Sequence, residues 1–187
     1  MMRIITGSAR GTRLKTLPGD NTRPTAERVK EAVFSMLGDA VRDARVLDLF
    51  GGSGQMGLEA VSRGASYALM IDNNREAAAV MAENARRTHL SDRVEIKVTD
   101  ATAFLKTAAG APFDLVFLDP PYAAGLLPTC LSLLAERGLL SSDAVVVCEA
   151  GNAAGFFGDR ADLPTRFEIL RDNRYGAACV RLLTLKK

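Results

Sequence analysis

Short apolar runs alternate with stretches of helical periodicity over most of this chain, from residue 45 onward. The runs are rich in Val, Ile, Leu and Phe, which favour buried strands. They predict strands at 45–50, 67–72, 94–98, 113–118 and 144–149. The stretches between them predict helices over about 55–63, 74–88, 101–108 and 124–137. Strands that alternate with helices form a largely parallel sheet with helices on both faces, so this pattern predicts an α/β fold.

The end of the chain breaks the alternation. Residues 151–163 contain glycines and little periodicity, and they predict a loop or a short helical turn. Two late strands are predicted at 166–170 and 178–183, with Arg174-Tyr175-Gly176 between them and no helix. Strands joined so closely pair antiparallel. The whole pattern therefore predicts a mostly parallel, seven-stranded sheet with an antiparallel edge.

The first residues follow another pattern. Residues 2–7 are a candidate for a short strand, and Gly7 and Gly11 predict a turn or hairpin there. A helix is predicted over about 26–37, with Thr25 as its N-cap.

Positive charge is concentrated at this end of the chain. The net charge is +2, but residues 1–30 hold seven basic and two acidic residues, which makes +5 against −3 for the remainder. A basic segment on a near-neutral body predicts an anionic partner, although a solvated charged arm has the same composition. We expect a basic strand or hairpin extension over 1–22 and one main domain over 23–187.

The composition of the 187 residues is that of a soluble globular protein, with 48% hydrophobic and 25% charged residues. No apolar run approaches the roughly 20 residues of a membrane span, and no signal-type apolar core follows Arg3, so we expect a cytoplasmic protein. Cys130, Cys148 and Cys179 lack Cys-x-x-Cys spacing, which indicates free buried thiols rather than disulfides or a zinc site. Nothing in the sequence requires more than a monomer.

A glycine-rich loop follows the first strand of the predicted sheet. Gly52-x-Gly54-x-x-Gly57 lets the backbone approach a ligand at a helix N-terminus, and it matches the dinucleotide fingerprint, so a nicotinamide cofactor has to be considered. Asp48 stands just before the loop. A carboxylate there suits the cationic end of a cofactor better than it suits a pyrophosphate.

Two further acids follow predicted strands. Asp72 stands 18 residues after Gly54, where an acid typically accepts hydrogen bonds from ribose hydroxyls. This holds for either cofactor and does not discriminate between them. Asp100 can accept a hydrogen bond from an adenine amino group, and it can also serve as a helix N-cap. The single histidine, His89, lies at a predicted helix end, which favours a capping role over catalysis.

The most informative stretch is Asp119-Pro120-Pro121-Tyr122, directly after the strand at 113–118. Each proline fixes φ and removes a backbone N–H, so the chain leaves the sheet as a rigid arm. That arm offers the Asp119 carboxylate, the Pro120 carbonyl and the flat Tyr122 ring. Two acceptors beside an aromatic face suit a planar base that carries an exocyclic NH2 group, which would stack on the ring.

Asp-Pro-Pro-Tyr resembles the catalytic motif of the amino-group methyltransferases, which use S-adenosyl-L-methionine. The Asp-x-Phe-x-Gly-x-Gly pattern that begins at Asp48 is similar to their first cofactor motif. Over nearly the whole chain the sequence resembles the RsmD family, bacterial enzymes that methylate N2 of a guanine in small-subunit (16S) ribosomal RNA. The matching pieces are Met2–Gly7, Thr22–Thr25 with Arg28, Val46–Gly54, Gly57–Ala60, Phe113–Tyr122 and Tyr175-Gly176.

The chain departs from this family at two places. Gly51 stands where the family more often has Ala, and Arg174-Tyr175-Gly176 lacks a second flanking basic residue that many members carry.

The resemblance implies a Rossmann-like, S-adenosylmethionine-dependent methyltransferase fold and assigns roles to residues. The catalytic residues are Asp119, Pro120, Pro121 and Tyr122. The cofactor-binding residues are Asp48, Leu49, Phe50, Gly51, Gly52, Ser53, Gly54, Asp72, Asn73, Asp100 and Ala101. The RNA-binding residues are Arg10, Arg13, Lys15, Arg23, Arg28 and Tyr175. The implied partner is small-subunit ribosomal RNA or the assembling small subunit.

Two other functions stay open at this point. A DNA adenine-N6 or cytosine-N4 methyltransferase shares the chemistry but usually needs an added target-recognition region, for which 187 residues leave little room. A nicotinamide-dependent oxidoreductase would use the glycine-rich loop but gives Asp119–Tyr122 no role.

Overall fold

The computed structural model describes residues 2–17, 24–121, 125–151, 156–176 and 178–187, with the side chains of 24–26 left aside. The strands are β1 (Arg45–Asp48), β2 (Tyr67–Asp72), β3 (Val94–Val98), β4 (Phe113–Leu118), β5 (Leu140–Ala150), β6 (Phe167–Tyr175) and β7 (Ala178–Leu185). The α-helices are α1 (Pro24–Leu37), α2 (Gln55–Ser62), α3 (Arg75–Arg87), α4 (Ala101–Thr107), α5 (Leu126–Glu136) and α6 (Leu163–Arg166). Short 3₁₀ turns, η1 (Gly38–Val41) and η2 (Ser91–Arg93), precede β1 and β3.

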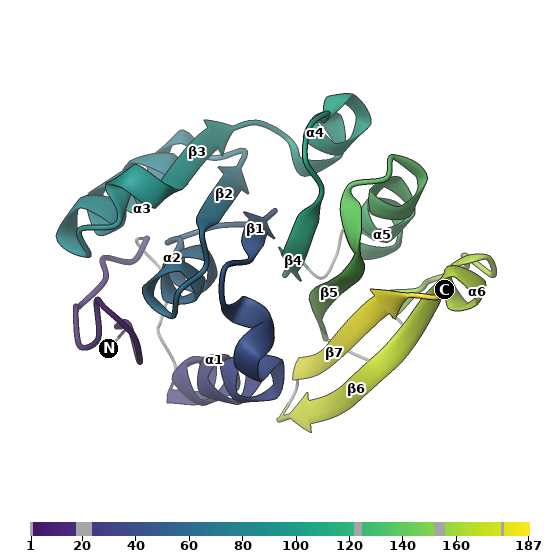
Figure 1. The fold of residues 1–187 in the computed structure, drawn as a ribbon, viewed down its shortest axis with the longest axis horizontal. Coiled ribbons are helices and arrows are strands. Elements are labelled where there is room, and N and C mark those ends of the chain that lie inside the picture. The colour runs from purple at the N-terminus through teal and green to yellow at the C-terminus, as the bar shows by residue number, and fades with distance from the viewer. Residues whose placement is uncertain (1, 18–23, 122–124, 152–155, 177) are drawn as a thin grey trace.

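The predicted layers are confirmed. The strands run diagonally across Figure 1, with α1, α2 and α3 on one side and α4, α5 and α6 on the other. Each face of the sheet has its own core of alternating strand residues, since successive side chains of a strand point to opposite faces. Val46, Met70 and Phe117 pack into the core beneath α1–α3, whereas Leu47 and Val116 pack into the core beneath α4–α6.

The sheet order is β3-β2-β1-β4-β5-β7-β6, with β1 to β5 parallel and β7 antiparallel to both β5 and β6. The chain moves outward from β1 through β2 to β3 and then returns to place β4 on the other side of β1. This reversal is a topological switch point, and in open α/β sheets ligands bind outside the carboxyl ends of the strands at such a point. The loops after β1 and β4 meet there.

Side-chain caps explain several helix boundaries. Asn74 accepts a hydrogen bond from the Glu76 N–H and caps α3, and Asp100 accepts one from the Ala103 N–H and caps α4. His89 adopts φ 57° just after α3, and the Leu90 N–H donates to the Ala85 carbonyl, as in a Schellman motif. His89 lies at the end of α3 as predicted, but the C-cap residue is Thr88, and His89 is the residue that follows it.

Several boundaries differ from the predictions. α1 begins at Pro24, so Thr25 lies inside its first turn and is not the N-cap; proline is favoured at a first helical position because its missing N–H has no partner there. β5 begins at Leu140 because Leu140 pairs with Phe113 of the parallel β4, before a register shift. β6 extends to Tyr175 and β7 to Leu185 because their antiparallel pairing continues beyond the apolar residues that marked these strands.

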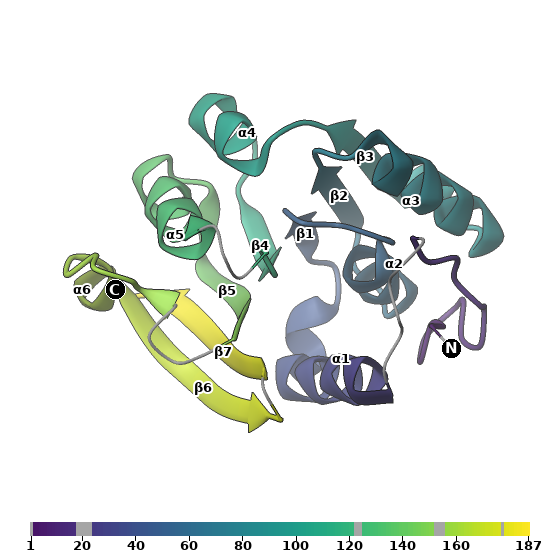
Figure 2. The ribbon, with the colours of Figure 1, turned by 180° about the vertical axis from the view of Figure 1, so that it is seen from behind.

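The predicted turn or hairpin at the N-terminus is confirmed, but residues 2–7 form no continuous strand. Residues 2–17 form a turn closed by one antiparallel bridge between Arg3 and Arg13, and they lie beside α2 in both views (Figures 1 and 2). Ile4, Ala9 and Leu14 are buried in the core beneath α1–α3. Side chains of this segment therefore complete the core, although the backbone pairs with no strand of the sheet.

The turn at Gly7 allows no side chain. Gly7 has φ +89°, and a Cβ there would lie 1.8 Å from the backbone oxygen of Ser62, which also accepts the Ser8 N–H at 2.9 Å. Glycine is required here both for the positive φ and for the close approach to α2.

Cys130, Cys148 and Cys179 are buried and unpaired, as expected. Among the described helices, none combines the length and the apolar character that crossing a membrane needs.

Candidate active site

The carboxyl ends of the parallel strands present four acidic residues on one face of the sheet. They are Asp48, Asp72, Asp119 and Glu149. Asp48 pairs in register with Met70 and Phe117, which face the core beneath α1–α3. The other three acids each stand two residues after Met70, Phe117 or Val147 of that same core, so they share its face. The switch point thus gathers a row of carboxylates where the sequence predicted a ligand site.

Asp48 is the buried member of the row. Its side chain is 4% exposed, and its Oδ2 accepts the Gly57 N–H at 3.2 Å. Burial raises its pKa to about 7, the charge of Asp72 adds to the rise, and the backbone N–H groups of Gly57 and Phe50 oppose it. A buried carboxyl group that is hard to ionise alone would be stabilised as a carboxylate by a cation bound beside it.

The glycine-rich loop closes over Asp48 with little spare room. Gly52 and Gly54 have φ +52° and +76°, and Gly54 starts α2. A Cβ on Gly57 would lie 2.8 Å from Met70, which is the close helix-to-strand contact that a third glycine permits. A Cβ on Gly51 would lie 2.6 Å from the Sδ of buried Met81. The glycine at position 51 therefore matches the volume of Met81.

The remaining predicted cofactor residues surround this loop. Asp72 accepts the Gly52 N–H at 2.9 Å with one oxygen and the Asn74 N–H at 2.9 Å with the other, so it holds the loop against β2. Asn73 is exposed beside it, while Leu49 is buried and Phe50 partly buried in the opposite core.

Ser53 and the start of α4 complete this set. Ser53 is buried, and its hydroxyl donates to the Met2 Sδ at 3.0 Å. Asp100 is exposed before the buried Ala101, and hydrogen bonds from the Thr102 hydroxyl and the Ala103 N–H lower its pKa.

The acceptor motif stands across the switch point from the glycine-rich loop. Asp119 follows β4 directly, Pro120 is buried and Pro121 is exposed. Tyr122 lies outside the described residues. Burial raises the pKa of Asp119 to about 7, with contributions from the charges of Glu149 and Asp48. Asp119 is nevertheless exposed to solvent, unlike Asp48, so water screens part of this effect.

Glu149 is an acid of this row that the sequence analysis did not single out. It lies at the end of β5, next to β4, one position beyond the paired Leu118 and Cys148. Its charge is the second cause of the raised pKa of Asp119. In the sequence, Glu149 is an acidic residue at the end of an apolar strand, and the same pattern identified Asp48 and Asp72.

Replacing Glu149 by Gln is expected to move the pH profile of the reaction to lower pH. The carboxylate form of Asp119 accepts hydrogen bonds and protons, so activity should rise as pH passes through its pKa of about 7. Glu149→Gln removes a neighbouring negative charge and lowers that pKa. Single-turnover rates from about pH 5 to 9 measure the midpoint, and exposed Glu168→Gln is the matched control. A midpoint that stays in place or rises would contradict the role of Glu149.

The structure brings together only part of the predicted RNA-binding set. Arg10 and Arg28 line one cavity between the N-terminal segment and α1. Arg13 is exposed on the same segment, and Lys15 is paired with Glu83 at 3.4 Å. Arg23 lies outside the described residues. Tyr175 ends β6 and packs partly buried against the core beneath α1–α3, apart from that cavity.

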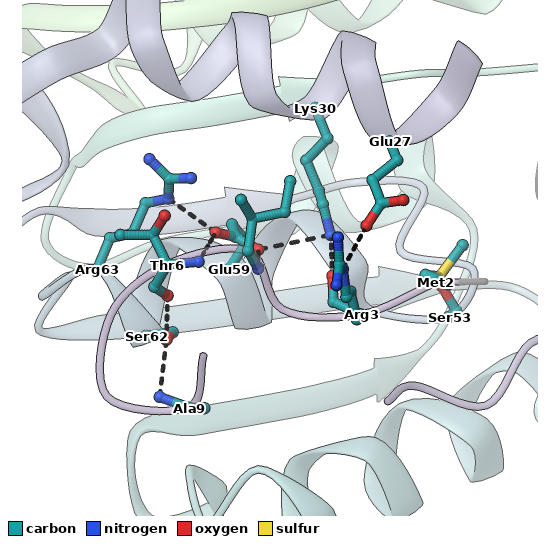
Figure 3. Close-up of polar contacts among 12 residues, drawn as sticks. Met2, Arg3, Thr6, Ala9, Glu27, Lys30, Ser53, Glu59, Ser62 and Arg63 are labelled. Atoms are coloured by element: carbon teal, nitrogen blue, oxygen red, sulfur yellow. Dashed lines mark hydrogen bonds and ion pairs between the residues drawn. The ribbon is translucent and has the colours of Figure 1, made fainter. Parts of the chain in front are cut away.

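A buried polar cluster centred on Glu59 of α2 was also missed (Figure 3). Glu59 is fully buried and accepts the Ile5 and Thr6 N–H groups at 2.8 and 3.0 Å. It pairs with Arg63 at 2.8 Å and with the buried Lys30 at 3.4 Å. Glu59 therefore joins the N-terminal segment to α1 and α2. A carboxylate amid the apolar residues of a short helix was the sequence signal.

Comparison with known proteins places the chain in a family. The model of the family described as "Conserved hypothetical protein 95" matches residues 2–184. Ribosomal RNA small subunit methyltransferase D of Escherichia coli (strain K12) is 33% identical over 181 residues, which are 97% of this chain and 88% of that protein. The protein of that name from Haemophilus influenzae is 32% identical over 183 residues, covering 97% and 92%. The chain belongs to the RsmD family.

A solved structure of similar sequence agrees with this fold. The Escherichia coli methyltransferase YhhF superposes with a TM-score of 0.85 at 31% identity, covering 99% of this chain and 98% of that chain. The Rossmann-like methyltransferase fold is confirmed. Because the RsmD-family chain is a methyltransferase, the nicotinamide interpretation of its glycine-rich loop is not retained.

Proposed function

We propose that this RsmD-family chain transfers a methyl group from S-adenosyl-L-methionine to the exocyclic N2 of a guanine in 16S ribosomal RNA, working in the cytoplasm as a monomer. One observation carries this proposal. Asp119-Pro120-Pro121 and the loop after Asp48 follow the neighbouring strands β4 and β1 at the switch point. Relatives named for small-subunit ribosomal RNA match almost the whole chain, which favours RNA over DNA as the substrate.

The residues present fit the proposed cofactor. The bound cofactor supplies an electrophilic methyl group on a positively charged sulfur. Asp48 and Asp72 would meet its cationic and ribose ends, and a pyrophosphate at the same place would be repelled by these carboxylates. The backbone at Gly52 leaves open space where a side chain would stand. Asp100, beyond its capping bond, keeps an exposed carboxylate for an amino group such as that of adenine.

Asp119 and the Pro120 carbonyl would each accept one hydrogen of the guanine amino group. These bonds orient the nitrogen and leave its lone pair aimed at the methyl carbon. The N–C bond would form as the S–C bond of the cofactor breaks, and Asp119 or water would take the extra proton from the nitrogen. Charge is dispersed in this step, so positioning supplies much of the acceleration, about 7–11 kcal/mol for well-aligned groups. The target base must first leave its stack, at a cost of a few kcal/mol.

The basic N-terminal segment would hold the RNA backbone. Since Ile4, Ala9 and Leu14 complete the core, deleting this segment would also remove part of the core, and a charge substitution is the cleaner test. Arg13→Ala is expected to lower the slope of log K against log salt by about 1, because one phosphate contact is lost. Fluorescence anisotropy with an RNA fragment across a salt series measures the slope. Exposed Arg87→Ala is the control, and equal slopes for the two variants would count against the role of Arg13.

Transfer of labelled methyl groups tests the proposed function directly. The substrates are small-subunit ribosomal RNA and particles from cells that lack this protein, with DNA in parallel, followed by nucleoside analysis. N2-methylguanosine in RNA alone is the expected product. N6-methyladenine or N4-methylcytosine in DNA would keep the catalytic assignment of Asp119 and overturn the substrate.

A further inference from the structure

A cavity of about 400 Å³ lies between the N-terminal segment and α1, away from the row of strand-end acids. Its lining includes Ile4 and Ile5 and the charged residues Arg10, Arg28 and Glu31. Its volume is within the range of small-ligand sites, about 300–1,000 Å³, and is sufficient for one nucleotide. None of the proposed cofactor-binding or catalytic residues lines it.

The wall formed by the N-terminal segment is held in place from behind. Buried Lys30 donates from Nζ to the Arg3 carbonyl at 2.6 Å, and buried Glu59 accepts the Ile5 and Thr6 N–H groups (Figure 3). Buried and satisfied polar groups of this kind fix the backbone. A ligand that enters the cavity would therefore lose little free energy in ordering this wall.

The charges of the lining are of both signs. Arg3 and Glu27 neutralise each other at 2.8 Å. Within the described part of the chain, the side chains of Arg10, Arg28 and Glu31 make no hydrogen bond or ion pair. The cavity thus offers two available guanidinium groups and one available carboxylate, from two different elements.

This set suits a nucleotide better than a phosphate alone. Two arginines can hold a phosphodiester, as guanidinium groups do bidentately, but a carboxylate beside them would repel it. A base with N–H donors gives that carboxylate a partner. Guanine offers N1–H and an N2 hydrogen side by side, which match the two oxygens of Glu31. Unpaired RNA bases are commonly read through hydrogen bonds to this edge.

We propose that this cavity binds one unpaired guanine nucleotide of the RNA, distinct from the base that is methylated. Arg10 and Arg28 hold its phosphate, and Glu31 accepts from N1 and N2 of the base. The proposal rests on the proposed function only in taking RNA as the partner. It gives the N-terminal segment a role in sequence recognition in addition to charge neutralisation.

Anisotropy with labelled five-nucleotide RNAs of sequence UUXUU tests this, with guanine, inosine or adenine at X. Inosine lacks the 2-amino group and so removes one N–H from Glu31. The wild-type chain is expected to favour guanine over inosine by about tenfold, as for one good bidentate pair. Glu31→Gln should remove this preference. Arg10→Ala and Arg28→Ala should weaken all three RNAs alike, each lowering the salt slope by about 1.

Exposed Glu168→Gln and Arg87→Ala are the charge-matched controls and should behave as wild type. A guanine preference that survives Glu31→Gln overturns the proposal, as does its absence from the wild-type chain. A guanine preference that survives Glu31→Gln but disappears in Asp119→Ala would mean that the base binds at the catalytic site alone. Binding is measured here without methyl transfer. Failure of the transfer assay would therefore overturn the proposed function, but the measured guanine preference would still test this proposal.

Discussion

Asp119→Ala is expected to lower the rate of methyl transfer by at least about 10³-fold, within the range of a lost positioning and proton-accepting group. The substitution removes the acceptor that orients the amino group and leaves the Pro120 carbonyl as the remaining one. The affinity for S-adenosylmethionine should change little, because Asp48, Asp72 and the glycine-rich loop are untouched. Single-turnover methyl transfer and calorimetric titration with the cofactor measure the two quantities separately.

Asp119→Asn is the matched companion of this variant. Its amide oxygen can still accept one hydrogen bond, but it has no charge and takes no proton. Asn should therefore retain part of the rate and lose the rise in activity around pH 7. Equal losses of transfer and cofactor affinity in the Ala variant would contradict the assigned role, since they would place Asp119 in the cofactor site.

The pKa of Asp119 also gives a stability control with a defined sign. A carboxyl group whose pKa is raised to about 7 on folding binds a proton more readily folded than unfolded. Its effect on stability is therefore favourable at low pH and is lost as pH rises from about 4 to 7. Asp119→Asn should be at least as stable as the wild type at about pH 8, so its lost activity cannot be attributed to unfolding.

Glu59→Ala is expected to lower the free energy of unfolding by about 3–5 kcal/mol, the typical loss when one partner of a buried ion pair is removed. It removes the carboxylate partner of the buried Lys30, which keeps only the Arg3 carbonyl as an acceptor, and it leaves the Ile5 and Thr6 N–H groups without their side-chain acceptor. Burial is the main cause that lowers the pKa of Lys30, and Glu59 opposes it, so without Glu59 the pKa of the amine should fall further. A fall in melting temperature of about 6–20 °C should follow for a chain of this size.

A double-mutant cycle separates the ion pair from the rest of the cluster. Lys30→Met with Glu59→Gln removes both charges and keeps an acceptor for a backbone N–H, so the double variant should be more stable than Glu59→Gln alone. Urea unfolding of the wild type, the two single variants and the double variant measures these free energies, with exposed Glu168→Ala as the control. A loss below about 1 kcal/mol for Glu59→Ala would mean that the cluster does not secure the N-terminal segment.

Periodicity alone determined the seven strands, the helices between them and the antiparallel edge. This worked because a buried parallel strand reads as a short apolar run, and its side-chain period differs from that of a helix. The acids at strand ends were also readable, since parallel strands bring their carboxyl ends to one edge. Asp48, Asp72, Asp100 and Asp119 all lie at that edge.

Contacts between segments far apart in the sequence were decided by the tertiary structure. The N-terminal segment packs into the core because Gly7 lets its backbone touch Ser62 and because Glu59, 53 and 54 positions away, accepts its N–H groups. The pKa of Asp119 depends on Glu149, which only the neighbouring position of β4 and β5 brings close. A local pattern records the propensity and burial of each segment, whereas hydrogen-bond partners, electric fields and cavities depend on which segments the fold makes adjacent.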